Sequence, residues 1–188
     1  MVTLPTANTI ADGTAVKTPG DKVFPYIRDH VDQIITIPDT ELVEAFLDVM
    51  EKHKMVVENS GLLTVAALKH LPAENKKVVS ILSGGNMDII TLSSVVQNGL
   101  IQRSRIFTVS VRLPDVPGQL NKVSKVIADA NGNVIKLEHN QFISVNRNSS
   151  VELIITMEAF GEDHKLSIIQ ALRDAGFAPE ERNPRALY

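Results

Sequence analysis

Hydrophobic positions in the first seventy residues recur mostly at helical spacing, after an irregular Thr-, Gly- and Pro-rich stretch over residues 1–25. The apolar run 33–37 predicts a short strand. A helix with one apolar face is predicted over 40–54, with Asp39 as its N-cap because a carboxylate accepts unpaired helix N–H groups. A second helix over 60–71 is apolar nearly all round, so it should be buried.

The run 77–82 predicts a short buried strand, followed by the turn Ser83–Asn86 and by a helix over 87–98 that stops at Gly99. The simplest interpretation is a tight turn in which Asn86 caps the helix. Strand, glycine turn and helix N-terminus together also present backbone N–H groups and a hydroxyl to a small polar ligand. The turn therefore points to a cofactor site.

The pattern changes after a boundary at residues 102–105, where alternating apolar and polar positions begin. Strands and helices then follow in the order β-α-β-β-α-β, at 107–113, 120–130, 133–139, 151–157, 166–175 and from Phe177 on. Gly132 and Gly176 end the two helices. This is the ferredoxin-like order, with an antiparallel sheet whose helices cover one face and leave the other free for pairing. The polar segment 140–150 is most simply a hairpin loop.

Composition narrows the class of protein. The chain has 188 residues, of which 44% are hydrophobic, and a formal net charge of −3. That charge argues against nucleic-acid or membrane partners, and no apolar run approaches the roughly 20 residues of a membrane helix. There is no cysteine, which excludes disulfides and thiolate chemistry. A cytoplasmic protein is expected, because no signal peptide opens the chain.

The five histidines are scattered, with no two-His helical pair and no surrounding carboxylates, so no metal site is predicted. They are His30, His53, His70, His139 and His164.

Three motifs, in order and spacing, resemble the threonine/serine ammonia-lyases, pyridoxal-phosphate (PLP) enzymes of the tryptophan-synthase-β fold type. They are Thr9–Val16, Val56–Gly61 and Ser83–Asn86. The β-α-β-β-α-β module with Leu113–Leu120 looks like an ACT domain, an amino-acid-sensing module common behind this catalytic domain. The resemblance implies an α/β part of the PLP fold over 1–103, followed by an α+β ferredoxin-like ACT domain over 104–188.

This chain lacks two motifs of the family. The family holds PLP as a Schiff base on a lysine in a Ser-x-Lys-x-Arg context and cradles its phosphate with a tetraglycine loop, and neither motif occurs here. The chain therefore looks like the C-terminal part of the enzyme, truncated or one subunit of a split enzyme, and no catalysis is expected from it alone.

The resemblance implies a cofactor-binding role for seven residues. Ser83 would hydrogen-bond the pyridine nitrogen, Asp12 and Gly13 would lie close to the ring, and Glu58 would sit near its far edge. The remaining members of the set are Gly84, Gly85 and Asn86. Asn59 and Ser60 depart from the usual Gly and Ala of the family. Simpler alternatives are a turn at Asp12-Gly13 and, for Glu58, a carboxylate favoured by a helix N-terminus.

The ACT resemblance implies an amino-acid effector pocket at the turn before the helix predicted from residue 120. The pocket residues would be Asp115, Val116, Pro117, Gly118, Gln119 and Leu120. The helix N-terminus suits the effector's carboxylate, and Asp115 suits its ammonium. The alternative is a plain turn, in which Pro117 sets φ at the helix start and Gly118 permits close packing.

The sequence thus predicts the C-terminal and regulatory portion of a threonine ammonia-lyase that converts threonine to 2-oxobutanoate and ammonia, and serine to pyruvate. Isoleucine or valine is the expected effector, and homodimerisation through the ACT domain and the missing catalytic half are the expected protein contacts. Two alternatives remain: a non-catalytic amino-acid-binding subunit acting on a separate catalytic chain, and a bare assembly module. Without the missing half, the strand edges at 33–37 and 77–82 should be exposed and the first part loosely held.

Overall fold

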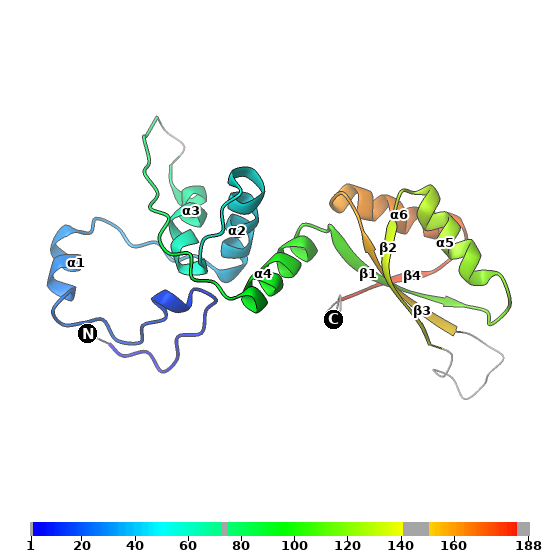
Figure 1. Ribbon diagram of the computed structural model, residues 1–188, viewed down its shortest axis with the longest axis horizontal. Coiled ribbons are helices and arrows are strands. Elements are labelled where there is room, and N and C mark those ends of the chain that lie inside the picture. Colours follow the sequence, from blue (N-terminus) through cyan, green and yellow to red (C-terminus); the bar gives the residue numbers. More distant parts are fainter. Residues whose placement is uncertain (1, 73–74, 141–150, 184–188) are drawn as a thin grey trace. The chain divides into compact units, whose positions relative to one another are not determined.

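The computed structural model describes residues 2–72, 75–140 and 151–183. The chain divides into two compact units, Met1–Gly99 and Leu100–Tyr188, which are described separately below (Figure 1). Within the described ranges, no helix is both long and apolar enough to cross a membrane.

The described part of the N-terminal unit is helical and contains no strand. Its elements are η1 (Asp12–Thr14), α1 (Phe24–His30), α2 (Asp39–His53), η2 (Asn59–Leu62), α3 (Leu63–Ala66), η3 (Ala67–His70) and the start of α4 (Ile89–Gln102). Its core is the apolar face of α2, with Leu42, Phe46 and Leu47 almost fully buried, packed with Leu62 and Val95. The amphipathic pattern thus positions α2 as the central element of this unit.

Helix α2 confirms the prediction over 40–54, but Asp39 does not act as its N-cap. Pro38 occupies that position, and Asp39 is the first residue of the helix. The Asp39 carboxylate instead accepts hydrogen bonds from Thr9 Oγ1 at 2.6 Å and from the Ile10 backbone N–H at 3.1 Å. A carboxylate near a helix N-terminus remains favoured by the helix dipole, and here it also fastens the distant segment that leads to η1.

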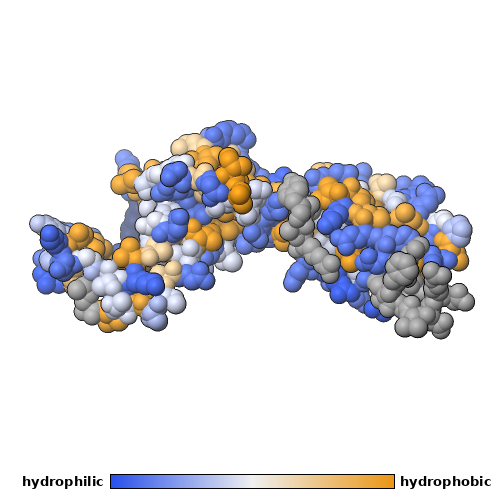
Figure 2. Space-filling view, turned by 60° about the horizontal axis from the view of Figure 1, so that its bottom comes forward, coloured by the Kyte–Doolittle hydropathy of each residue, from blue (hydrophilic) through white to orange (hydrophobic). Residues whose placement is uncertain are grey.

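Both strands predicted in the first unit were wrong. Residues 33–37 and 77–82 have no regular structure, and Val79 and Ile81 of the second run are 89% and 73% exposed. A parallel strand exists only when a neighbour completes its hydrogen bonds, and no described segment lies beside either run as a strand. Figure 2 shows apolar patches (orange) on the surface of the chain. Ile34, Val78, Val79 and Ile81 of the two runs are among the exposed large hydrophobic residues.

The helix predicted over 60–71 is three short segments, η2, α3 and η3, and it is only partly buried, since Leu68 is 43% exposed. Helix α4 begins at Ile89, capped by Asp88 and not by Asn86: Asp88 Oδ1 accepts the N–H groups of Ile90 and Thr91, each at 2.9 Å. The N-cap prediction at Asn86 was therefore wrong.

Gly99 does not end α4, which continues to Gln102. A Cβ at Gly99 would lie 2.5 Å from Leu47 Cδ1 and 3.2 Å from Val43 Cγ1. The glycine is required by the close approach of α4 to α2, and the helix passes through it.

The C-terminal unit has the predicted ferredoxin-like architecture. Its elements are β1 (Ile106–Leu113), α5 (Gln119–Asp129), β2 (Asn133–Asn140), β3 (Val151–Glu158), α6 (Glu162–Asp174) and β4 (Pro179–Arg182). The strands pair antiparallel in the order β2-β3-β1-β4, with Val109 opposite Ile155 at the centre. Helices α5 and α6 lie on the same face of the sheet (Figure 1). The loop predicted at 140–150, with Asn146, Asn148, Ser149 and Ser150, lies outside the described residues from 141 on.

The core of this unit lies between the helices and the alternating apolar positions of β1 and β3, with Val123 and Ile127 of α5 at 0% and 1% exposure. Leu120, expected on the same face, is 42% exposed. Gly176, in the left-handed region at φ 86°, follows α6, and the next N–H, of Phe177, returns to the Leu172 carbonyl at 3.0 Å. This is the predicted glycine-terminated helix end.

The opposite face of the sheet is polar. Thr108 and Thr156 share a hydrogen bond of 2.9 Å, and Arg182 donates to Ser110 at 3.3 Å and to Glu152 at 3.2 Å. Any contact made by this face therefore has to satisfy polar groups.

Candidate functional site

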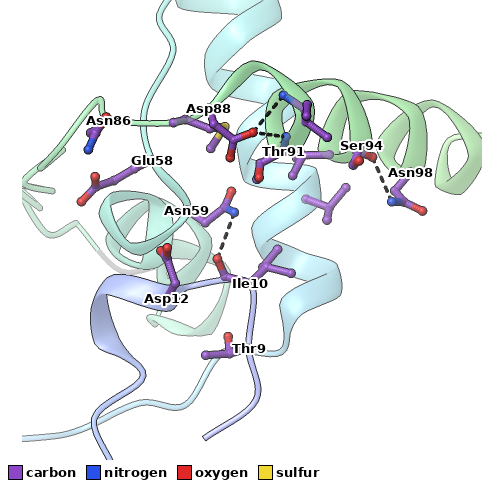
Figure 3. A pocket seen from close by; sticks show the side chains of 14 residues that line it. Thr9, Ile10, Asp12, Glu58, Asn59, Asn86, Asp88, Thr91, Ser94 and Asn98 are labelled. Atoms are coloured by element: carbon purple, nitrogen blue, oxygen red, sulfur yellow. Dashed lines mark hydrogen bonds between the residues drawn. The ribbon is translucent and has the colours of Figure 1, made fainter.

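The N-terminal unit holds a cavity of about 400 Å³ between η1, the start of η2 and helix α4 (Figure 3). Asp12, Glu58 and Asn86 line this cavity, so the structure brings together residues from all three predicted cofactor motifs. The other four residues of the predicted cofactor set, Gly13, Ser83, Gly84 and Gly85, are outside its lining.

The Ser83–Gly84 turn packs directly against the segment that carries Glu58. Gly84 has φ 78°, and a Cβ there would lie 2.0 Å from the Glu58 carboxyl carbon. The Glu58 N–H donates to the Gly84 carbonyl at 3.3 Å, and a Cβ at Gly61 would meet the Ser83 carbonyl oxygen at 1.8 Å. Glycine is thus required at Gly84 by its left-handed conformation and at Gly61 by contact with the Ser83 backbone.

The Ser83 side chain is exposed and makes no hydrogen bond within the described chain. On the other side of η2, a Cβ at Gly13 would lie 2.8 Å from Ser60 Oγ. One packed region therefore contains three segments that are far apart along the chain. They are the Asp12-Gly13 turn, η2 and the Ser83–Gly84 turn, and η2 contacts both turns.

The cavity has a strongly one-sided charge. The charged side chains that line it are all carboxylates, from Asp12, Glu58 and Asp88. Hydrogen bonds from the Thr91 side chain and from the backbone N–H groups of Thr91 and Ile90 hold the pKa of Asp88 below its ordinary value, so Asp88 is ionised at neutral pH. Among the described residues, no group of three or more His, Cys, Asp or Glu is arranged to hold a metal ion.

Asn59, which the sequence marked only as a departure from the family's usual Gly, lines this cavity. It is only 4% exposed, and its Nδ2 donates to the Ile10 carbonyl at 3.0 Å. Its Oδ1 is buried without a hydrogen-bond partner. Sequence patterning cannot show this, because the partner of Nδ2 lies 49 residues away. The polar residues Thr91, Ser94 and Asn98 of the lining, in contrast, recur at helical spacing along α4 and can be read from the sequence.

The C-terminal unit holds a second cavity, of about 310 Å³, at the turn between β1 and α5. All six residues predicted for the effector site line it: Asp115, Val116, Pro117, Gly118, Gln119 and Leu120. Exposed Leu120 thus faces this cavity and not the core. Gly118 has φ 89° with nothing within 4 Å of a built Cβ, so conformation and not close packing explains the glycine.

His139 also lines this second cavity, although the sequence analysis did not assign it there. It pairs with Leu153 in the β2–β3 ladder. The alternation of β2 places it on the face of Leu137, which would have been the signal for it.

Two protein-family models match separate parts of the chain. The family described as "Pyridoxal-phosphate dependent enzyme" matches residues 1–84, and the ACT domain family matches residues 107–177. The L-threonine ammonia-lyase of Geobacter sulfurreducens is 35% identical over 94% of this chain and 44% of that protein. The L-threonine ammonia-lyase of Thermotoga maritima is 31% identical over 90% of this chain and 42% of that protein.

A solved structure of a threonine deaminase from "T.th." is 32% identical over 47% of this chain and 33% of that chain, with a TM-score of 0.41. The chain thus spans less than half the length of the curated relatives described above. Both families match in the order found in the fold, and relatives of one activity align with nearly all of the chain. The chain is therefore similar to threonine ammonia-lyases, with a segment that matches the pyridoxal-phosphate dependent enzyme family followed by a segment that matches the ACT domain family.

Proposed function

We propose that this chain supplies the regulatory ACT domain and part of the cofactor site of an enzyme that converts threonine to 2-oxobutanoate and ammonia, and serine to pyruvate. The effector is proposed to be isoleucine or valine. The observation that carries the proposal is the β1–α5 cavity, where all six predicted effector residues meet. The names of the two ammonia-lyase relatives support the reaction.

The effector site is proposed to hold a free amino acid at both of its charged groups. The N-terminus of α5 offers backbone N–H groups to a carboxylate. Asp115 offers a carboxylate to the ammonium, and Val116 and Leu120, which are 51% and 42% exposed, offer apolar contact to a branched side chain. This arrangement suits isoleucine or valine better than a small or polar amino acid.

The residues present fit one end of PLP. When bound in the whole enzyme, PLP withdraws electrons from the α-carbon of the substrate. The exposed Ser83 hydroxyl is free to hydrogen-bond the ring nitrogen, and the Gly84 backbone rests on Glu58. Asp12, Gly13, Gly85 and Asn86 complete the proposed set, and no phosphate cradle is proposed among the described residues because the cavity lining is acidic.

The proposal divides the chain into a catalytic part over 1–103 and the ACT domain over 104–188. The exposed apolar runs of the first part, including Val79 and Ile81, are proposed to pair with the catalytic half that the longer relatives possess. The ACT domain is proposed to form homodimers. Effector binding would then act on catalysis through subunit packing, with a coupling of typically about 1–3 kcal/mol.

The second candidate function is a non-catalytic regulatory subunit that binds an amino acid and acts on a separate catalytic chain. The sequence observation in its favour is that these 188 residues contain neither the Ser-x-Lys-x-Arg motif nor the tetraglycine loop. Both candidates require the same effector cavity, whereas a bare assembly module does not.

Calorimetric titration of the full chain with isoleucine and valine tests the proposal, with threonine and alanine as controls. Saturable heat is expected for a branched amino acid and not for alanine. Asp115→Asn should weaken binding about tenfold, since it removes a charge-assisted hydrogen bond. The matched control is Asp163→Asn, an exposed carboxylate at the start of α6 that lies outside the cavity lining. Absence of heat with a folded ACT domain would favour the assembly module.

A further inference from the structure

The polar face of the sheet in the C-terminal unit carries its charges in rows that run across the strands. Helices α5 and α6 lie on the other face (Figure 1). In the strand order β2-β3-β1-β4, the register aligns one residue of each strand in a row: Lys136, Thr156, Thr108 and Arg182. This row therefore has a cation at each end and two threonines between them.

The next row on the same face carries the opposite charge. In the same strand order it consists of Glu138, Ile154, Ser110 and Glu180. Successive rows on one face are two residues apart along each strand, which is about 7 Å. A cationic row and an anionic row thus lie side by side, and a cavity of about 220 Å³ opens over them.

Ion pairs within the chain connect the two rows at both ends. Lys136 contacts Glu138 at 3.2 Å on β2, and Arg182 contacts Glu180 at 3.6 Å on β4. These four side chains are between 30% and 62% exposed, so water screens each pair and each contributes little by itself. Each pair is also a local dipole along its strand. A second pair that points the other way, laid over it, would give every charge a further opposite neighbour.

A two-fold axis that runs parallel to the rows, midway between them, produces this arrangement. Two sheets that pack face to face keep their strand directions within about 30° of each other. The axis lays the cationic row of one copy over the anionic row of the other. Lys136 then lies opposite Glu138 of the second copy, and Arg182 lies opposite Glu180 of the second copy. Each contact occurs twice, because a two-fold interface is self-complementary.

The charge pattern excludes the other way of stacking the same two faces. A two-fold axis along the strands would set Lys136 opposite Arg182 of the second copy, and Glu138 opposite Glu180. Like charges would then meet at both edges of the sheet, which is unfavourable. The pattern therefore selects the axis that runs across the strands.

The centre and the outer rows are compatible with the selected axis. At the centre, Ile154 of one copy lies over Thr156 of the other, where the cavity leaves room. Thr156 keeps its hydrogen bond with Thr108 when it is covered. In the outer rows, Glu158 lies opposite Glu152 of the second copy, but Arg182 already neutralises Glu152 within each chain, at 3.2 Å.

We infer that this face is the contact surface of a homodimer, in which a second copy of the chain packs face to face with its strands antiparallel to the first. The inference deepens the homodimer suggested under the proposed function and rests on it, but it requires no effector. Because charged groups dominate the contact, the dimer should weaken as the salt concentration rises.

Complementary charge reversals test the contact, with sedimentation equilibrium of the full chain as the measurement. Across the axis, Lys136→Glu sets glutamates against glutamates, and Glu138→Lys sets lysines against lysines. Each variant alone should therefore dimerise at least about tenfold more weakly than the wild type. An equimolar mixture of the two variants should regain the wild-type affinity, because each reversed charge meets its opposite in the other chain. A change confined to one chain cannot produce this recovery.

A matched control reverses the same charge on the helical face. Lys125 of α5 has a side chain that is 72% exposed, and Lys125→Glu should leave the dimer affinity unchanged. Raising the salt concentration should weaken the wild-type dimer. This salt dependence tests the inference without any variant, so it still applies if a reversed chain fails to fold.

The possible failures are distinguishable. A wild-type dimer that neither reversal weakens, or a mixture that dimerises no better than its components, would overturn this face as the contact and assign the homodimer to another surface. A strictly monomeric wild type at tens of micromolar would overturn both the face and the homodimer. A dimer strengthened by Lys136→Glu would contradict the selected axis. Calorimetric binding of the effector is independent of all these results, so failure of the proposed effector site is recognised separately.

Discussion

Gly99 of α4 lies against Leu47 of α2 so closely that a methyl group at Gly99 would be 2.5 Å from Leu47 Cδ1 and 2.8 Å from Leu47 Cγ. Leu47 is 1% exposed and belongs to the core of the N-terminal unit, so it has little space into which to move. The contact therefore sets how closely the two helices approach.

Gly99→Ala should lower the free energy of unfolding of this unit by about 1–3 kcal/mol through overpacking. Amide exchange of α2 residues at increasing denaturant concentration measures this change in the free energy of unfolding. Ser93→Ala, at an exposed position of the same helix, is the control and should change stability by less than about 0.5 kcal/mol. An ordinary helix interior would instead gain about 1 kcal/mol from Gly→Ala, and such a gain would contradict the contact.

Asp39 joins the N-terminal segment to α2 through Thr9 and Ile10. Asp39→Ala should destabilise the unit by about 1–2 kcal/mol, because two donors lose a charged acceptor. Amide exchange at Ile10 should accelerate. A double-mutant cycle with Thr9→Val should give a coupling of about 0.5–1.5 kcal/mol; additive effects of the two changes would show that the bond contributes nothing.

Asp88 and Asn86 are both candidates for the N-cap of α4. In the structure, Asp88 accepts the N–H groups of Ile90 and Thr91 and therefore caps the helix. Asp88→Ala should accelerate amide exchange at Ile90 and Thr91, whose N–H groups lose their acceptor. Asn86→Ala should leave exchange at both amides unchanged. Faster exchange in Asn86→Ala and unchanged exchange in Asp88→Ala would instead show that Asn86 is the cap.

Lys165 on α6 bridges Glu162 of the same helix and Glu181 of β4, at 3.1 and 3.0 Å, with its side chain only 13% exposed. Burial lowers the pKa of Lys165, but the hydrogen bonds with Glu181 and Glu162 outweigh it, and the net shift is upward from 10.5. Hydrogen bonds from Ser104 and then Lys165 lower the pKa of Glu162 from 4.5. Lys165→Met should cost about 1 kcal/mol near neutral pH.

The pH dependence of this ion-pair bridge follows from the directions of the two pKa shifts. The raised pKa of Lys165 gives stability that is present below 10.5 and is lost as the pH rises through the folded value. The lowered pKa of Glu162 gives stability that is present above 4.5 and is lost as the pH falls through the folded value. The difference in Tm between the wild type and Lys165→Met should therefore be constant between these limits and shrink at both extremes. A difference that persists at strongly acidic pH would show that packing, not charge, accounts for it.

The sequence predicted the C-terminal unit better than the N-terminal unit. The alternation in β1 and β3 and the helical spacing in α5 and α6 are local patterns, and every strand of that sheet finds its partner within the unit. In the N-terminal unit, the runs 33–37 and 77–82 have strand composition but no neighbouring strand in the described chain. Composition creates a tendency to form a strand, whereas pairing decides whether one forms.

Short-range patterns in the sequence predicted the βαββαβ order, the resemblance to a known family and the six residues that line the β1–α5 cavity, because each is written in local periodicity or in a contiguous motif. Only the tertiary structure decided that Asp39 holds Thr9, that Asp88 and not Asn86 caps α4, and that Asn59 keeps a buried, unpaired oxygen. In the first and last of these, the decisive contact joins segments about thirty to fifty residues apart. Long-range contacts of this kind arise from packing and leave no periodic trace in the chain.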